Sequence, residues 1–221
     1  MGDIEIVPAI LRRTLEGIKE DWAKVESVAA HIQLDVTDGV FAGDGTFREI
    51  RTFKQLSNSH KIELHMMVQD PASFADDVVN LAPARCIFHI EAFAGHDNVA
   101  IVYDKLRAAS PQTQFGLAIN PGTPSEYLDE HIGRIDYVLF MGYNPGWAGQ
   151  QVVPSVFPKI GRFAGKYPNI PIAVDGQVNT QTIPDFVHAG ARILCANSSI
   201  FKEGNPIENF EQLKLLARTA I

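Results

Sequence analysis

Residues 30–39 read AHIQLDVTDG, and their alternation predicts a β-strand with an unusually polar face. Gln33 and Asp35 fall on one side of the expected strand, with His31 behind them on the same side, while the apolar residues between them face the other way. The stretch then ends in a turn-like Asp38-Gly39. A glutamine and a carboxylate therefore stand on the same face where the strand ends.

Seven further short runs rich in β-branched and apolar residues lie along the chain, and stretches with apolar residues at helical spacing lie between them. Strand–helix repeats predict parallel strands, because a parallel connection needs a crossover of a dozen or more residues. The expected strands are 4–9, 31–36, 61–67, 85–91, 114–119, 136–141, 170–175 and 191–196. The clearest helical patterns are 15–29, 72–82, 98–109 and 209–220.

Eight such units in 221 residues predict an α/β protein, a single (β/α)8 TIM barrel that occupies residues 1–221 as one domain. A doubly wound open sheet is the competing architecture. That fold usually shows a glycine-rich turn after its first strand, but here the chain continues through Pro8-Ala9-Ile10-Leu11. In a barrel the functional residues lie at the C-terminal ends of the strands, so candidate residues are sought there.

The composition argues against several classes of partner. The net charge of −7 and the pI near 5.5 disfavour nucleic acid and anionic membranes as partners. Asp3 and Glu5 stand where a secretory signal would be basic, and no stretch approaches the roughly 18 apolar residues of a membrane span. We therefore expect a cytoplasmic protein. Cys86 and Cys195 fall within expected strands and are interpreted as buried thiols.

Polar residues gather at the ends of the second, third and seventh expected strands. Side chains alternate between the two faces of a strand, and this alternation predicts inward-pointing side chains at Gln33, Asp35, His65 and Asp175. Charged groups on the inner face of a barrel need partners or a metal. A lone aspartate at a strand end is more often a turn residue or a helix cap, but that reading explains two inward carboxylates and a histidine poorly.

These residue types suggest a chemistry. A divalent ion held by Asp35, His65 and Asp175 would stabilise charge on a substrate oxygen. The two carboxylates could then remove a proton from one face of a carbon and return one to the other face.

The loops after the last three expected strands indicate where an anionic ligand is held. Barrels commonly bind phosphate through backbone N–H groups after the seventh and eighth strands, here at Gly176-Gln177 and Asn197-Ser198. The sequence NPGWAGQ, residues 144–150, adds a glycine-hinged loop that could fold over a ligand. A plain surface loop is the alternative for that segment.

In their order and spacing, PAIL, LDVTDG, LHMMV, NPGWAGQ, VDGQVN and ANSSIF resemble the ribulose-phosphate 3-epimerase family, from about residue 7 to about residue 201. NPGWAGQ followed by Pro154 and Lys159 is the most specific signal. The resemblance implies a barrel that interconverts D-ribulose 5-phosphate and D-xylulose 5-phosphate through a metal-stabilised enediolate. It also implies a homo-oligomer, a dimer or larger, and a step of the pentose phosphate pathway.

The resemblance assigns roles residue by residue. Asp35 and Asp175 become the acid–base pair and, with His65, ligands of one divalent ion, either Zn, Fe, Mn, Co or Mg. The residues that it places in phosphate binding are Gly146, Gly176, Gln177, Asn197 and Ser198, and those that it places in the pocket are Ala9, Met67 and Met141.

The chain departs from the family pattern on or beside this site. The family has H-x-D-x-M-D-G on the second strand, and the first and fifth positions are here Gln33 and Thr37. Gln33 thus stands in place of a fourth metal ligand, and its neutral amide oxygen would move the preference from Zn²⁺ or Fe²⁺ toward Mg²⁺ or Mn²⁺. Gln177 and Asn197 each replace a glycine, and Ala9 replaces a serine.

Three functions stay open at this stage. The first is a 3-epimerase of ribulose 5-phosphate. The second is a 3-epimerase of another ketose phosphate, such as a hexulose 6-phosphate, since Ala9, Thr37 and Gln177 could reshape the pocket. The third is a barrel that binds a sugar phosphate without turning it over, although two inward carboxylates are costly unless they are used. Decarboxylases and aldol synthases of similar fold are disfavoured, because they need a lysine where this chain has DVTD at residues 35–38.

Overall fold

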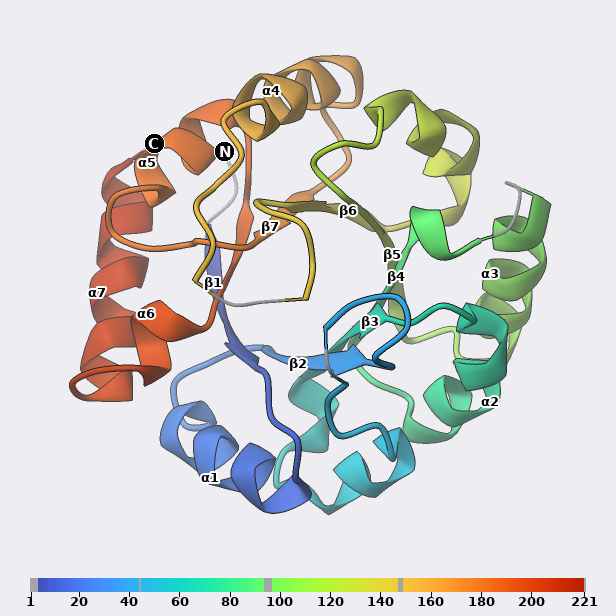
Figure 1. Ribbon diagram of the computed structural model, residues 1–221, viewed down its shortest axis with the longest axis horizontal. Helices are drawn as coiled ribbons and strands as arrows, with labels where there is room; N and C mark the ends of the chain where they lie inside the picture. The colour runs from blue at the N-terminus through green and yellow to red at the C-terminus, as the bar shows by residue number, and fades with distance from the viewer. Residues whose placement is uncertain (1–3, 44, 94–96, 147–148, 221) are drawn as a thin grey trace.

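The computed structural model describes residues 4–43, 45–93, 97–146 and 149–220. Eight parallel strands close into a barrel in chain order, with the last strand paired to the first, so the predicted (β/α)8 TIM barrel is confirmed (Figure 1). The strands are β1 (Glu5–Ile10), β2 (Ile32–Thr37), β3 (Ile62–Met67), β4 (Arg85–His89), β5 (Gln114–Ile119), β6 (Tyr137–Met141), β7 (Ile172–Asp175) and β8 (Ile193–Ala196).

The expected strand boundaries were shifted by one or two residues at several ends. At β4 the secondary structure itself differs from the expectation, because the strand ends at His89 rather than continuing through Glu91. A single 3-10 turn, Ile90–Ala92, follows it and carries Glu91.

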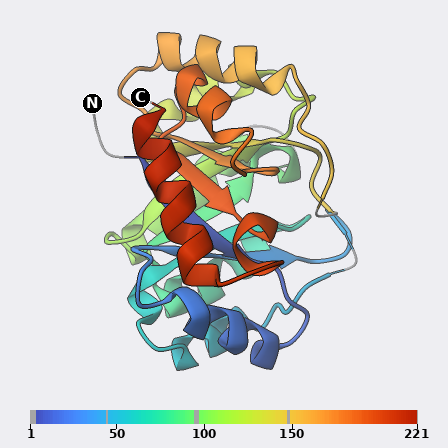
Figure 2. The same ribbon diagram turned by 90° about the vertical axis from the view of Figure 1, so that its left-hand side faces the viewer.

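Helices surround the barrel on the outside (Figures 1 and 2). They are α1 (Leu15–Val25), α2 (Pro71–Leu81), α3 (Asp97–Ala109), α4 (Val156–Lys166), α5 (Ile183–Ala189), the short α6 (Ser198–Phe201) and α7 (Pro206–Thr219). In Figure 2, α7 runs along the outer face of the barrel, with α6 beside one of its ends. The connections after β2 and β5 use 3-10 helices instead, at Ile50–Gln55, Ser59–Lys61 and Ser125–Arg134.

Side-chain caps begin several of these helices. Thr14 accepts a hydrogen bond from the Gly17 amide at the start of α1, and Asp70 accepts one from the Ser73 amide at the start of α2. The expected helix 15–29 was too long, because the chain leaves α1 after Val25 in a turn where the Val28 amide binds the Val25 carbonyl.

The strands bury their two faces against different layers. The outward residues of β2, such as Leu34 and Val36, join the large core that includes Trp22 of α1. A smaller apolar cluster fills the barrel interior, made of Val7, Ala9, Ile87, Ala118, Tyr137, Leu139, Met141, Ala173, Ile193 and Cys195. This interior is largely apolar, but it includes the buried Tyr137 hydroxyl, which has no hydrogen-bond partner among the described residues. In the described part of the chain, no helix is both long enough and apolar enough to cross a membrane.

A group of charged residues, here called the basal cluster (Glu5, His31, Glu63 and Arg85), lies at the N-terminal end of the strands. Arg85 donates from Nη1 to Glu63 Oε2 at 3.1 Å and from Nη2 to Glu5 Oε2 at 2.8 Å. His31 Nδ1 lies 2.6 Å from Glu5 Oε1. His31 precedes β2 and lies well below Gln33, as the alternation predicts.

Candidate active site at the barrel mouth

The strand register brings three of the predicted residues together at the C-terminal end of the barrel. Asp35 of β2 is paired with His65 of β3, and Asp175 is the last residue of β7. Within the described residues, these three side chains form a group whose ligand atoms all lie within 4.8 Å of one another. The predicted metal ligands Asp35, His65 and Asp175 therefore converge.

His65 lies between the two carboxylates. Its Nδ1 is 3.0 Å from Asp35 Oδ1 and 3.1 Å from Asp175 Oδ2. The imidazole is fully buried, and burial by itself lowers its pKa, but hydrogen bonds to Asp175 and Asp35 and their negative charges raise it to about 10. Burial and the charge of Asp175 raise the pKa of Asp35. In this arrangement an imidazolium balances part of the negative charge of the pair.

Gln33 lies two residues before Asp35 on the inner face of β2, and it is fully buried. Its Nε2 donates to Asp35 Oδ1 at 2.8 Å and to Asp175 Oδ2 at 2.7 Å. The same nitrogen is 3.4 Å from His65 Nδ1. Oε1 of Gln33 is buried and has no hydrogen-bond partner among the described residues.

The donor set at this place fits a divalent cation. Two carboxylates and an imidazole suit Mg²⁺, Mn²⁺, Fe²⁺ and Zn²⁺. The 3.0 and 3.1 Å separations from His65 Nδ1 match the roughly 3.0 Å between adjacent ligands around an octahedral ion with bonds of about 2.1 Å. The orphaned Gln33 Oε1 adds a neutral acceptor beside them. Asp35, His65 and Asp175 are thus a candidate metal centre.

A chain of polar groups continues outward from His65, and sequence reasoning did not assign it to the site. His65 Nε2 lies 2.9 Å from His89 Nε2, and the two rings are stacked. His89 Nδ1 is in turn 3.5 Å from Glu91 Oε2. Burial lowers the pKa of His89, so His65 is the donor in the contact between the rings, which orients its Nδ1 toward the carboxylates. The FHIEA sequence at residues 88–92, with a histidine and a glutamate at a strand end, was the signal from which His89 and Glu91 could have been assigned to the site.

Asp38 has a different role from Asp35. Its Oδ1 accepts from the amides of Val40 and Phe41, each at 2.8 Å, and its Oδ2 accepts from the Gln69 amide at 2.7 Å. Burial raises the pKa of Asp38, but the backbone donors outweigh this effect and hold the pKa below its ordinary value. Asp38 therefore shapes the loop after β2, in agreement with its interpretation as a turn residue.

A cavity opens above the three converging residues. Of the predicted pocket residues, Met67 and Met141 line it, while Ala9 is fully buried and Leu11 lines it instead. The complete lining is Leu11, Asp35, Thr37, Met67, Met141, Tyr143, Pro145, Gly146, Asp175 and Asn197. A smaller cavity adjoins it, lined by Tyr143, Gly149, Asp175, Gly176, Gln177, Val178, Cys195, Asn197 and Ser198.

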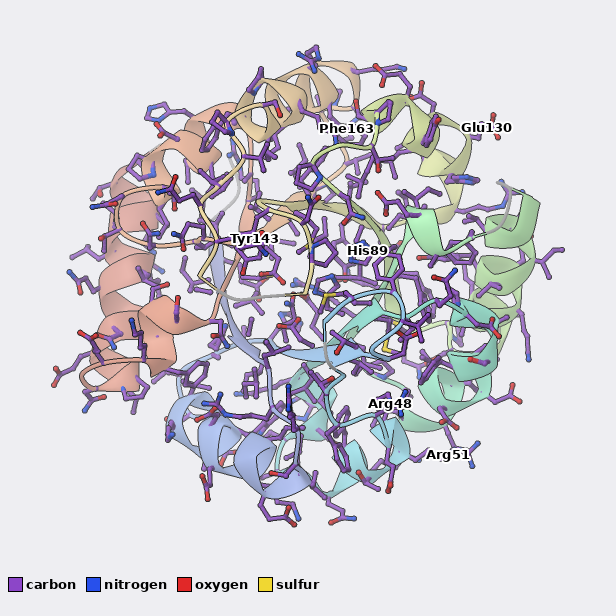
Figure 3. All side chains as sticks on the ribbon, viewed as in Figure 1. Arg48, Arg51, His89, Glu130, Tyr143 and Phe163 are labelled. Carbon is purple, nitrogen blue, oxygen red and sulfur yellow. The ribbon has the colours of Figure 1, made fainter. Side chains whose placement is uncertain are left out.

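Tyr143 lines both cavities, and sequence reasoning did not single it out. Its ring packs against Gly176, where an added Cβ would lie 3.1 Å from it. Burial and the charges of Asp175 and Asp35 raise the pKa of the phenol. In Figure 3, Tyr143 and His89 lie within the ring of helices, whereas Glu130 and Arg51 lie at the periphery. Tyr143 thus stands between the carboxylates and the predicted phosphate loops.

The predicted phosphate-binding residues after β7 adopt an unusual backbone. Gly176 has φ 110° and Gln177 has φ 57°, a left-handed conformation that costs a non-glycine residue on the order of 1 kcal/mol or more. The Gln177 carbonyl accepts from Thr182 Oγ1 at 2.6 Å, which holds the turn. Gly142 is required beside it, because a Cβ there would lie 2.2 Å from the Gly176 carbonyl oxygen.

The residues after β8 are arranged differently. Asn197 has φ −104°, so the asparagine at this position, where the resemblance led us to expect a glycine, does not need a left-handed backbone. Its Nδ2 donates to the Ala9 carbonyl at 2.6 Å and ties the end of β8 to β1. Ser198 begins α6, where the first amides have no partner within the helix.

Two loops meet over the mouth of the barrel. An added Cβ on Gly43, after β2, would lie 2.8 Å from the Gly146 carbonyl oxygen, after β6. Gly146 itself has φ 128°, which favours glycine. Figure 1 shows the two loops approaching each other across the opening. Trp147 and Ala148 of the NPGWAGQ loop lie outside the described residues.

Comparison with known proteins decides the family. The model of the "Ribulose-phosphate 3 epimerase family" matches residues 5–201. The chain belongs to the ribulose-phosphate 3-epimerase family. A ribulose-phosphate 3-epimerase of Candida glabrata is 31% identical over 231 residues, covering 95% of this chain and 90% of that protein. One of Schizosaccharomyces pombe is 26% identical over 220 residues, covering 97% and 94%. The family consists of sugar-phosphate epimerases, which are isomerases.

Solved structures of low sequence identity share the fold of this member of the epimerase family. KGPDC from Streptococcus mutans aligns with a TM-score of 0.73 at 10% identity, over 99% of both chains. The 3-hexulose-6-phosphate synthase of Salmonella typhimurium aligns with a TM-score of 0.68 at 13% identity, over 99% of this chain and 100% of that one. At these identities the likeness concerns the barrel alone.

Proposed function

We propose that this chain is a divalent-metal-dependent 3-epimerase of a ketose phosphate, with D-ribulose 5-phosphate and D-xylulose 5-phosphate as its substrate pair. The observation that supports this most is the pair of carboxylates, Asp35 and Asp175, held on β2 and β7 by contacts to the same imidazole. Membership of the ribulose-phosphate 3-epimerase family supports the reaction class.

In the proposed reaction the two aspartates exchange protons with one carbon. Asp35 in its ionised form removes the proton from C3 on one face, and the electron pair of the C–H bond moves into an enediolate. Asp175, protonated, returns a proton to C3 on the opposite face, and the stereocentre is inverted. In the reverse direction the two residues exchange roles.

The other site residues hold this pair in place. When bound by Asp35, His65 and Asp175, a divalent ion supplies positive charge for the enediolate oxygens. His89, backed by Glu91, keeps His65 Nδ1 directed at the carboxylates. Met67 and Met141 present apolar surface to the cavity, which limits the access of water to the carbanion.

The second, smaller cavity supports binding of the phosphate. Its lining joins Gly176 and Gln177 after β7 to Asn197 and Ser198 after β8, and Gly146 lines the adjoining cavity. No lysine or arginine stands among these lining residues, so the proposed phosphate contacts are backbone N–H groups and the Ser198 hydroxyl. Tyr143 would then face the middle of the ketose phosphate.

The test is incorporation of solvent deuterium at C3 of the substrate. We expect exchange into ribulose 5-phosphate in D₂O with Mg²⁺, Mn²⁺ or Zn²⁺, and loss of exchange with a chelator. Absence of exchange with every metal contradicts the proposal. Parallel assays with hexulose 6-phosphates identify the substrate, because faster turnover of a six-carbon ketose phosphate would replace ribulose 5-phosphate while leaving the chemistry intact.

The proposal extends to the organisation of the protein. We propose one domain for residues 1–221, supported by the closed barrel and by the match over residues 5–201. A homo-oligomer in the cytoplasm, acting in pentose phosphate metabolism, is proposed from the family resemblance. Light scattering on the purified protein tests the oligomeric state, and a monomer at micromolar concentration contradicts that part.

A further inference from the structure

The Gln33 carboxamide lies against all three side chains of the candidate metal site. Its Nε2 is within 3.4 Å of all three candidate ligand atoms, at 2.8 Å from Asp35, 2.7 Å from Asp175 and 3.4 Å from His65. The amide has two N–H bonds, and the two carboxylates provide one acceptor for each. The NH₂ group therefore bridges the pair and places partial positive charge beside both carboxylates.

The opposite end of the same carboxamide is unsatisfied. Gln33 is fully buried, and Oε1 has no partner among the described residues, although a buried acceptor without a donor is costly. Rotation by half a turn about the last side-chain bond exchanges Oε1 and Nε2. Oε1 would then face Asp35 and Asp175, an arrangement that is repulsive unless a cation lies between the three oxygens.

We propose that the Gln33 carboxamide is a two-position gate of the metal site. In one position, seen in the structure, its NH₂ group bridges Asp35 and Asp175; in the other, Oε1 faces the site as a ligand of a divalent ion. The two positions exclude each other, so ion binding must break both hydrogen bonds. The inference rests on the proposed metal site, but it does not depend on turnover of any substrate.

The gate has a consequence for which ion is bound. A carboxamide oxygen is a hard, neutral ligand that suits Mg²⁺ and Mn²⁺, whereas an imidazole suits Zn²⁺. Each ion must also displace the two hydrogen bonds of the NH₂ group, which weakens binding of all ions. Gln33→His removes the bridging NH₂ group and offers an aromatic nitrogen instead, so it should raise Zn²⁺ affinity more than Mg²⁺ affinity.

The first experiment observes the gate in the unmodified protein. In ¹H–¹⁵N spectra of chelator-treated protein, the Gln33 side-chain NH₂ signals, assigned by their loss in Gln33→His, should be shifted downfield and protected from exchange with solvent. Saturation with Mg²⁺ or Zn²⁺, verified by calorimetry, should move both signals and shorten their exchange lifetime. The NH₂ signals of Gln112, which is exposed at the other end of the barrel, should not change.

The second experiment measures affinity. By calorimetry, Gln33→His should bind Zn²⁺ about tenfold or more tightly than the wild type, the scale on which changes around metal sites act, with a smaller change for Mg²⁺. The control Gln112→His adds an imidazole at the exposed far end and should leave both affinities unchanged.

Three results overturn the gate: unchanged Gln33 signals on ion binding, equal Zn²⁺ affinity in wild type and Gln33→His, or no binding of either ion. Deuterium exchange at C3 stays a separate measurement. Unchanged Gln33 signals together with normal exchange refute the gate alone, and a responsive Gln33 without exchange on any ketose phosphate refutes the proposed epimerase alone.

Discussion

The two ends of this barrel hold polar clusters of similar chemistry, but among the described residues the cluster at the mouth has an unpaired amide oxygen, whereas the carboxylates of the basal cluster are paired. In the basal cluster, Arg85 places Nη1 on Glu63, Nη2 on Glu5 and Nε on Gln114 at 3.2 Å. At the mouth, two carboxylates share one imidazole and one amide, and an amide oxygen is left without a partner among the described residues. The basal cluster is matched, whereas the mouth is arranged to receive something more.

Cavity size alone would point to the end of the barrel opposite the proposed site. The cavity beside the basal cluster, lined by Glu5, Arg85 and Tyr167 among others, has a volume of about 610 Å³, and the cavity at the mouth has about 50 Å³. Yet Glu5 and Arg85 are already paired with each other. The unpaired buried Gln33 Oε1, and not the cavity volume, is therefore what distinguishes the mouth from the basal cluster.

Asp175→Asn should have the largest effect, and it tests the role of the carboxylate pair at the mouth of the barrel. Loss of one of the two acid–base groups should lower the rate of deuterium exchange at C3 by about 10²- to 10⁴-fold. Stability should hold, because the variant removes a charge from a crowded carboxylate pair. The control Asp104→Asn, on an exposed side chain of α3, should exchange at the normal rate. A loss below tenfold for Asp175→Asn would contradict its assignment.

Arg85→Met tests the basal cluster and should show the opposite pattern. It leaves the fully buried Glu63 without its charged partner, and removing one member of a buried pair costs about 3–5 kcal/mol of unfolding free energy. Urea denaturation measures this loss. Exchange at C3 per folded molecule should stay near that of the wild type.

The double variant Arg85→Met with Glu63→Leu refines that result. It should recover much of the lost stability, because no unpaired charge is then buried. If Arg85→Met instead lowered exchange as far as Asp175→Asn does, the distinction between the two ends of the barrel would be wrong.

Tyr143→Phe tests whether the phenol of the mouth contacts the substrate. Loss of one hydrogen bond, worth about 0.5–1.5 kcal/mol, should raise KM for the ketose phosphate about 2- to 10-fold with a smaller change in kcat. The ring keeps its packing on Gly176, so stability should not change. Tyr167→Phe, beside the basal cavity, is the matched control and should keep the normal KM. Equal KM values in all three proteins would remove Tyr143 from the substrate site.

Glu5 provides the smallest effect, a pH dependence of the basal cluster. Burial raises its pKa, but the hydrogen bond to His31 and the charge of Arg85 outweigh this and lower it below 4.5. A lowered carboxyl pKa contributes stability above pH 4.5 that is lost as the pH falls through the folded-state value. The wild type should exceed Glu5→Gln by up to about 1 kcal/mol at neutral pH, and urea denaturation should show that the difference disappears in acid. A constant difference would contradict this assignment.

Much of the candidate site could be predicted from the sequence, because the alternation of side chains is a property of each strand by itself. The period of two in a strand placed Gln33 and Asp35 on the inner face of β2, and the same rule applied to His65 and Asp175. The position of each residue along its own strand then placed it at the mouth. The strand boundaries were harder to predict, because hydrogen bonds to neighbouring strands decide them. An example is β4, which ends two residues earlier than expected.

What the sequence by itself determined is thus which residues alternate inward and at which end of each strand they lie, because backbone geometry within a strand decides both. Only the tertiary structure decided the contacts across the barrel, because closure and register set distances between strands far apart in the chain. It placed Gln33 Nε2 between Asp35 and Asp175, joined His65 to His89, and brought Tyr143 against Gly176. It also left Gln33 Oε1 without a partner among the described residues, which no one-dimensional pattern can reveal.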